Sequence, residues 1–373
     1  MEFVITNTKA QQSSTESFMD FVDRVLLLRS NMSDTKRFCI TCKGQYFDDQ
    51  RIKDWIATAI KCRVEELVLG RFANDEDYSD IMPVDLYTCE SLTLLDIEFH
   101  YGTLHLPQTI LFSRLKILRL SEISFCDEEF IQQLFSGCPV LEELSLKYCA
   151  WKDLNFISST LKVLTLVDSL LRSEHKSVFP VITKIDAPNL MSLKIDDCLK
   201  NTLVVHSFPS LVDAHIRLSH SMGDDGMDVV LNFLNKLSNV KHLKVTGYIF
   251  EDLETANLVS TSLLAFTNLI TLEVSIIKAE QVLIIDKANK DALTVDVVPH
   301  CLLMNLKSIK FQNFEGQRNE LDLVKLFLQN AGVLQTVTIE ISSNSLVNSK
   351  KKTHTAKDVE DFNKQIMRQL TKF

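Results

Sequence analysis

The sequence has few of the residues that build phosphate-binding loops and sharp turns, with only nine glycines and seven prolines in 373 residues. It has no glycine-rich phosphate motif, no H-E-x-x-H zinc motif and no G-x-S-x-G nucleophile motif. No run approaches the roughly eighteen apolar residues of a membrane span, and the first residues do not resemble a secretory signal. We therefore expect no cofactor, no metal site and no membrane association.

Charge and cysteine content narrow the possible partners and the compartment. The formal net charge is −9, so the chain should have no overall attraction to nucleic acid or to anionic membranes. The nine cysteines are odd in number and scattered, which fits free thiols in a reducing compartment better than a disulfide framework. We expect a monomeric protein of the cytoplasm or nucleus.

A six-residue pattern, L-x-x-L-x-L, recurs along most of the chain. Twelve copies, some degenerate, begin at Thr35, Val64, Leu92, Leu115, Leu141, Leu161, Leu190, Leu211, Val240, Leu269, Leu306 and Leu334. The last two apolar positions lie two apart, so they share one face of a short strand while the intervening residues face away. The pattern predicts an α/β leucine-rich-repeat solenoid, or horseshoe, of about twelve irregular repeats with a parallel concave sheet and helical caps.

The connecting segments indicate how the chain is divided. Residues 1–32 should form an N-terminal cap helix, with Phe18, Phe21, Val22, Val25 and Leu28 on its apolar side; 33–296 should hold repeats; 297–341 should form the C-terminal repeats. Further helices are expected at 51–61, at 127–135 with Asp127 as N-cap and Gly137 as a left-handed end, at 224–237 and at 320–330. Segments 103–114 and 203–210 should be irregular turns.

The last segment, residues 342–373, should be a polar loop followed by an amphipathic helix over 356–370. This helix would either cap the solenoid or bind a partner.

Aligning the repeats predicts which side chains face outward from the sheet. The expected partner-binding positions on the concave face are Glu66, Asp96, Glu98, Arg119, Glu143, Lys147, Lys194, Asp213, His215, Arg217, His242 and Lys244. The early positions are acidic, and the later ones are mixed with a basic bias. These charges would select a partner of complementary charge. The alternative is that they have no binding role and are present only because this face of the sheet is exposed to solvent.

Other residues offer little support for catalysis or metal binding. Cys39-x-x-Cys42 has no second pair, and the two acids between Gly223 and Gly226 should break the chain before a helix. Cys149 and Cys198 occupy the inward N/C position of their repeats. His215 and His242 should lie on adjacent strands, where a catalytic pair is conceivable, but no nucleophile accompanies them.

The stretches FSGCPVLEELSLKYC, LKVLTLV and APNLMSLKIDDC resemble the repeats of plant F-box/LRR proteins. The later stretches VPHCLLMNLKSIKF and ELDLVKLFLQNA are similar to the FBD module of these proteins, so residues 297–341 are expected to be FBD-like. The resemblance implies recognition of a protein substrate for an SCF-type ubiquitin ligase. The F-box that docks a Skp-type adaptor is not among these residues, so we do not expect this chain to bind the adaptor.

The sequence thus favours a non-enzymatic protein-interaction module that binds an unidentified protein substrate. One alternative is a small-molecule co-receptor on the same scaffold, because some plant LRR F-box proteins are hormone receptors. The other is an enzyme that uses the neighbourhood of His215 and His242.

Overall fold

The structure is a computed structural model of the chain. It describes residues 2–7, 12–29, 34–42, 48–70, 81–104, 106–125, 128–150, 153–167, 182–196, 202–205, 208–218, 223–247, 266–275, 300–314 and 318–341. The chain divides into two compact units, the first being Met1–Met191 with Asn201–His206 and the second Ser192–Lys200 with Ser207–Phe373.

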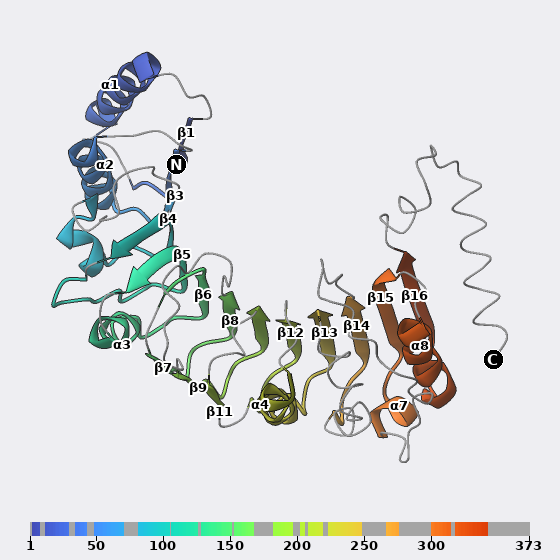
Figure 1. Cartoon of the computed structure of the whole chain (residues 1–373). Coiled ribbons are helices and arrows are strands. Elements are labelled where there is room, and N and C mark those ends of the chain that lie inside the picture. Colours follow the sequence, from blue (N-terminus) through green and yellow to red (C-terminus); the bar gives the residue numbers. More distant parts are fainter. Residues whose placement is uncertain are drawn as a thin grey trace, which may run out of the picture. The chain divides into compact units, whose positions relative to one another are not determined.

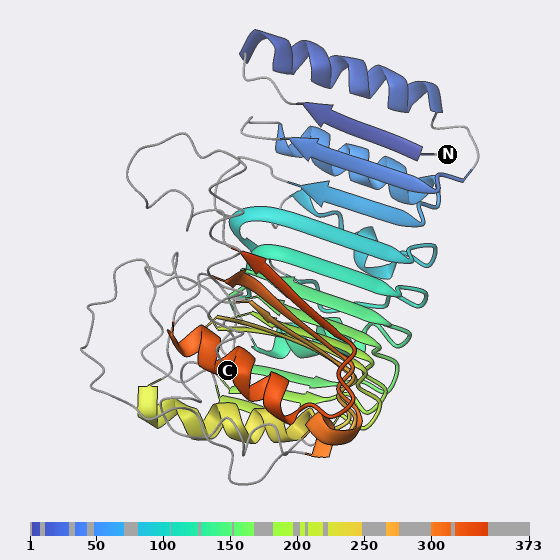
Figure 2. The ribbon, with the colours of Figure 1, turned by 90° about the vertical axis from the view of Figure 1, so that its right-hand side faces the viewer.

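The first unit is built on a parallel sheet whose strands stack one beside another (Figures 1 and 2). In order across the sheet these are β1 (Glu2–Asn7), β2 (Arg37–Cys42), β3 (Glu66–Gly70), β4 (Leu94–Leu104), β5 (Ile117–Phe125), β6 (Glu143–Lys147) and β8 (Val163–Val167). Strand β1 pairs in register with β2 although it carries no copy of the repeat pattern. A strand thus precedes the helix expected within residues 1–32.

A second, three-stranded parallel sheet accompanies the first. It consists of β7 (Asp153–Ile157), β9 (Ile182–Asp186) and β11 (Thr202–Val205), in the order β11-β9-β7. The expectation that residues 203–210 form only an irregular turn is therefore wrong for the part in β11. The connecting segments of successive repeats satisfy each other's backbone groups here, a long-range pairing that no local pattern reveals.

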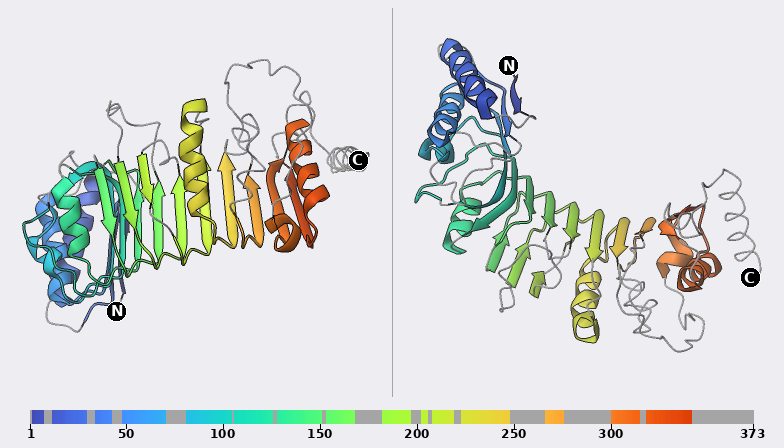
Figure 3. Two further views of the ribbon diagram at one scale, coloured as in Figure 1. Left: turned by 90° about the horizontal axis from the view of Figure 1, so that it is seen from below. Right: turned by 45° about the horizontal axis from the view of Figure 1, so that its top comes forward.

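The strands of the second unit are also parallel to one another. In order they are β10 (Ser192–Asp196), β12 (Asp213–Leu218), β13 (His242–Gly247), β14 (Thr271–Ser275), β15 (Ser308–Phe314) and β16 (Thr336–Ile341). Helices α4 (Gly223–Lys236), α7 (His300–Met304) and α8 (Arg318–Asn330) belong to this unit, and Figure 3 shows α4 extending to one side of the strands. Phe327 of α8 lies 6.2 Å, centroid to centroid, from Phe311 of β15, so α8 covers the core side of that strand.

Each of the twelve pattern copies forms a strand, and the apolar pair within the strand is buried in every copy except the last, where Val337 of β16 is 37% exposed. Leu144 and Leu146 in the first unit are fully buried, and Leu243 and Val245 in the second are each only 3% exposed. Burial of such a side chain contributes about 1.5–3 kcal/mol, so a stack of aligned pairs stabilises each sheet. The leucine-rich-repeat solenoid expected from the sequence is confirmed.

The helices of the first unit are α1 (Gln12–Arg29), α2 (Asp49–Lys61), the 3-10 helix η2 (Val84–Thr88) and α3 (Glu128–Ser136). Helix α2 begins after the N-cap Asp48, whose side chain accepts a hydrogen bond from the Arg51 backbone N–H. It buries Ile52, Trp55, Ile56 and Ala59. Figure 1 shows α2 and α3 on the same side of the sheet.

Helix α1 presents a different face from the one expected. Its buried residues are Met19, Val22 and Leu26, while Phe21 and Leu28 are 63% and 81% exposed. Polar contacts with α2 set this orientation, because Arg51 Nη1 lies 2.8 Å from Asp20 Oδ1 and Trp55 Nε1–H donates to Asp23 Oδ1 at 2.6 Å. The hydrophobic periodicity alone could not indicate these partners.

Two smaller expectations also differ from the structure. Gly137 is not in the left-handed region; instead, a Cβ there would lie 2.7 Å from the Ile110 carbonyl oxygen, so close packing requires the glycine. Helix α4 begins at Gly223, so the residues between Gly223 and Gly226 belong to the helix and do not break the chain before it. The expectations for Asp127, Cys198 and residues 342–373 lie outside the described residues.

Candidate functional site

The side of each sheet opposite the core carries the residues that alternate with the buried ones, and we call it the open face. Each strand formed by a pattern copy has the apolar pair of the pattern, and three outward positions alternate with that pair. Row one is the position before the first residue of the pair, row two is the position between the two residues, and row three is the position after the second. The strands pair in register, so each row runs straight across the sheet, as in Val68, Asp96 and Arg119 of row two. All twelve residues expected on the outward face lie in these rows.

Three of these residues form a network in the first unit. Arg119 Nε on β5 donates to Glu143 Oε1 on β6 at 2.8 Å, and its Nη1 lies 3.8 Å from Asp96 Oδ2 on β4. The register places Asp96 beside Arg119, and it places Glu143 one row from Arg119 on the next strand. The arginine is thus shared between two carboxylates and lies closer to Glu143.

Of the two acids that share Arg119, Asp96 has the negative charge that is less well compensated, and Glu143 has the shorter contact. Burial raises the pKa of its carboxyl, the nearby Arg119 and Lys147 oppose that rise, and Glu98 adds to it. A carboxylate in this position gains from any further positive charge brought near it.

The other positions of the first unit lie on the same face. Arg37 Nη1 is 3.5 Å from Glu66 Oε2 on the neighbouring strand, and Glu98 and Lys147 occupy row three. Apolar side chains separate these charges: Leu94, Ile117 and Val163 occupy row one, and Val68 row two. All four are half-buried, so the face is partly apolar.

The open face of the second unit is more completely polar. Its rows hold Ser192, Lys194, Asp196, Asp213, His215, Arg217, His242, Lys244, Thr246, Thr271, Glu273, Ser275, Ser308, Lys310, Gln312, Thr336, Thr338 and Glu340. Arg217 Nη1 lies 3.2 Å from Asp196 Oδ2, whose side chain is only 10% exposed. Asp213 is exposed in row one, beside His242.

Further ion pairs and hydrogen bonds cross the second unit from strand to strand. Lys244 Nζ is 2.7 Å from Glu273 Oε1 and 3.3 Å from Gln312 Oε1. Gln312 Nε2 donates to Glu340 Oε2 at 3.1 Å, and Lys310 Nζ lies 2.7 Å from Glu340 Oε1. The charges of β13 to β16 therefore largely compensate one another.

His215 and His242 do not form a pair with each other. His215 Nε2 lies 3.4 Å from Thr246 Oγ1, and His242 Nδ1 lies 2.7 Å from Thr271 Oγ1. Burial, then the positive charges of Lys194 and Lys244, lower the pKa of His215 to about 4, so its ring is neutral near pH 7. Nothing in this arrangement activates a nucleophile, and the enzyme hypothesis gains no support from it.

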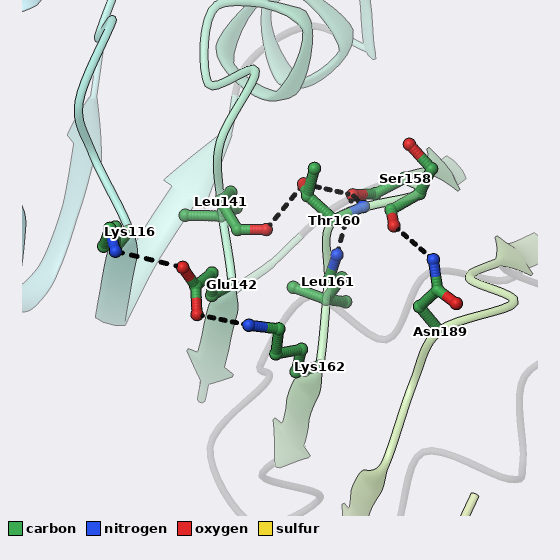
Figure 4. Close-up of polar contacts among 9 residues, drawn as sticks. Lys116, Leu141, Glu142, Ser158, Thr160, Leu161, Lys162 and Asn189 are labelled. Carbon is green, nitrogen blue, oxygen red and sulfur yellow. Dashed lines mark hydrogen bonds and ion pairs between the residues drawn. The ribbon is translucent and has the colours of Figure 1, made fainter. Parts of the chain in front are cut away.

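The sequence did not reveal a ladder of polar contacts at the start of the strands, outside the open face (Figure 4). Thr160 Oγ1–H donates to the Leu141 carbonyl oxygen at 2.8 Å, and Asn189 Nδ2 donates to the Ser159 carbonyl oxygen at 2.7 Å. Beside these bonds, Glu142 accepts from Lys162 at 2.8 Å and lies 3.2 Å from Lys116. The Ser, Thr or Asn before several pattern copies was the available signal.

Cys149 and the possible metal ligands can also be located in the structure. Cys149 Sγ–H donates to backbone carbonyls at 3.4 and 3.5 Å, and burial raises its pKa to about 12, which confirms the structural role expected for it. Within the described residues no group of three or more His, Cys, Asp or Glu could hold a metal ion.

Among the helices that the structure describes, none is both long enough and apolar enough to cross a membrane.

Comparison with known proteins gives the family. The model described as "FBD-associated F-box protein At5g56370, LRR repeats" matches residues 52–274, and the FBD model matches residues 296–339. The chain is 27% identical to F-box/FBD/LRR-repeat protein At4g26340 of Arabidopsis thaliana over 357 residues, which cover 89% of the chain and 81% of the relative. It is 31% identical to F-box/LRR-repeat protein At4g14103 of the same plant over 262 residues, or 65% of each chain. The resemblance found in the sequence is confirmed: the chain belongs to the plant family of FBD-associated F-box proteins with leucine-rich repeats.

Proposed function

We propose that this chain recognises a protein substrate for an SCF-type ubiquitin ligase and that the open faces of its sheets bind that substrate. The observation that carries the proposal is the set of ordered charged side chains on faces opposite the core, in a family whose names combine an F-box with leucine-rich repeats. A parallel sheet whose core side is covered offers its other side to a partner.

The role proposed is binding without catalysis. Ion pairs such as Arg119 with Glu143 and Lys244 with Glu273 hold charged groups in fixed positions. Fixed charges give a partner surface specificity more than affinity, which suits the selection of one substrate among many proteins.

We further propose the cytoplasm or the nucleus as its compartment. Six cysteines in the described residues form no disulfide: Cys39, Cys62, Cys89, Cys138, Cys149 and Cys301. Free thiols are typical of proteins in a reducing compartment.

The test compares proteins captured from a plant extract by two variants with equal changes in charge. The open-face variant is Arg119→Glu with Lys244→Glu. The control is Lys116→Glu with Lys307→Glu, which alters exposed residues at the strand starts. We expect the open-face variant to lose proteins that the wild type and the control retain, measured by quantitative mass spectrometry. Equal capture by all three chains would contradict binding through the open faces.

The ligase part of the proposal needs a second measurement. The chain is fused to an F-box of known adaptor binding and added to a reconstituted ligase with one of the proteins captured selectively. We expect that protein to be ubiquitylated by the wild-type fusion and not by the open-face variant. Binding without any ubiquitylation would contradict a role in substrate delivery.

A further inference from the structure

The open face of β3, β4 and β5 in the first unit combines an apolar strip with a carboxylate in need of positive charge. Leu94 and Ile117 are direct partners across the two strands in row one, and Asp96 and Arg119 are direct partners in row two. Asp96 lies two residues from Leu94 on the same side of β4, a separation of about 7 Å along a strand. A site for an apolar contact and a site for a charged contact thus lie two residues apart along β4.

The charge balance of this region favours a cation. The open-face positions of β3 to β6 hold the acids Glu66, Asp96, Glu98 and Glu143 against the bases Arg119 and Lys147. Arg119 lies 2.8 Å from Glu143 and 3.8 Å from Asp96, so Asp96 has the longer of the two contacts. Its side chain is 29% exposed and can be reached from solvent.

Among the residues that the structure describes, the second unit offers no equivalent position. Three of the bases on its open face form ion pairs with acids: Arg217 at 3.2 Å, Lys244 at 2.7 Å and Lys310 at 2.7 Å. The open-face rows of β10 to β16 contain no apolar side chain in the described residues. The apolar contacts that supply most binding energy are available on the first unit.

We propose that the open face of β3, β4 and β5 docks an extended segment of a partner protein that carries a basic side chain beside an apolar one. The basic side chain binds Asp96, and the apolar side chain packs on Leu94 and Ile117. An extended segment has alternate side chains on one side about 7 Å apart, which matches the separation of the two contacts. This inference rests on the proposed function and names the partner chemistry for one of the open faces.

The test uses the full chain and two short fluorescein-labelled peptides, one alternating lysine with leucine and one alternating glutamate with leucine. Fluorescence anisotropy should show that the wild type binds the lysine peptide and not the glutamate peptide. Asp96→Asn should weaken binding about tenfold, the effect of one charge-assisted hydrogen bond. Asp85→Asn removes the same charge from an exposed position in η2 of the first unit, outside the strands, and should leave binding unchanged.

A photo-crosslinking residue locates the peptide. Placed at Ile117 it should crosslink the lysine peptide, and placed at Thr271, a row-one position of the second unit, it should not. Equal loss from both Asn variants, binding of the glutamate peptide, or no binding by the wild type would overturn the inference. If the inference fails while the open-face capture difference persists, the proposed function stands with a partner of other chemistry.

Discussion

Strand β5 of the first unit and strand β13 of the second are alike on one side and unlike on the other. Toward the core, β5 buries Leu118 and Leu120, and β13 buries Leu243 and Val245. On the open face, β5 presents Ile117, Arg119 and Ser121 where β13 presents His242, Lys244 and Thr246. The core positions repeat because neighbouring strands bury the same face, while the open positions are free to differ from strand to strand.

The largest expected effect tests whether the two cores are equivalent. Leu144→Ala in the first unit and Leu243→Ala in the second should each lower the free energy of unfolding by about 3 kcal/mol, because each leaves a cavity among buried side chains. Urea unfolding followed by circular dichroism measures both losses. A loss below about 1 kcal/mol in either variant would mean that the core of that unit tolerates cavities and that the cores differ.

The next effect compares the central arginines of the two open faces. Arg217→Ala should cost about 2 kcal/mol, because it removes the ion pair between the guanidinium and the buried carboxylate of Asp196. Arg119→Ala should cost about 1 kcal/mol, because Asp96 and Glu143 are 29% and 27% exposed and water can solvate them. Urea unfolding of both variants gives the difference. Addition of Asp196→Asn should restore part of the loss from Arg217→Ala; a further loss would contradict this account.

A pH-dependent effect belongs to the second unit. The pKa of His215 is about 4 in the folded chain, against about 6.5 for a free histidine. The unfolded chain therefore binds a proton there first, so stability falls as the pH drops from about 6.5 toward 4. After allowance for solvent screening we expect about 1 kcal/mol, absent in His215→Gln, from urea unfolding at pH 7 and pH 5. Equal pH dependence in the wild type and the variant would refute it.

The smallest effect concerns the apolar strip of the first unit. Ile117→Thr should change the free energy of unfolding by no more than about 0.5 kcal/mol, because the side chain is half-buried and threonine retains the strand preference. Thermal unfolding measures it, with Leu118→Ala as the buried neighbour for comparison. A loss near that of Leu118→Ala would place Ile117 in the core and remove the contrast between the two open faces.

Much of the fold could be predicted because its signals are local. The spacing of Leu141, Leu144 and Leu146 gives a strand and its buried side without knowledge of any neighbour, and the same holds for the other pattern copies except the last, where Val337 is 37% exposed. Aligning those copies also placed Asp96, Arg119 and Glu143 on one face. The distances of 2.8 and 3.8 Å between them, which make Arg119 favour Glu143, could not be read from the alignment.

Other features depend on segments far apart in the sequence. Strand β1 lacks the repeat pattern and is fixed only by pairing with β2, and β7, β9 and β11 are defined by pairing with one another. The buried side of α1 follows from contacts of Asp20 and Asp23 with α2. Backbone pairing and ion pairs between distant segments leave no periodic trace in the hydrophobic pattern.

The sequence by itself determined the repeat, its buried leucines, and which charged side chains share the open faces, because strand alternation is a property of consecutive residues. Only the tertiary structure decided which of those charged side chains pair with one another. Sharing of Arg119 leaves Asp96 less compensated in the first unit, while Lys244, Glu273 and Gln312 satisfy one another in the second. The reason is that pairing and burial depend on distances between strands that only folding sets.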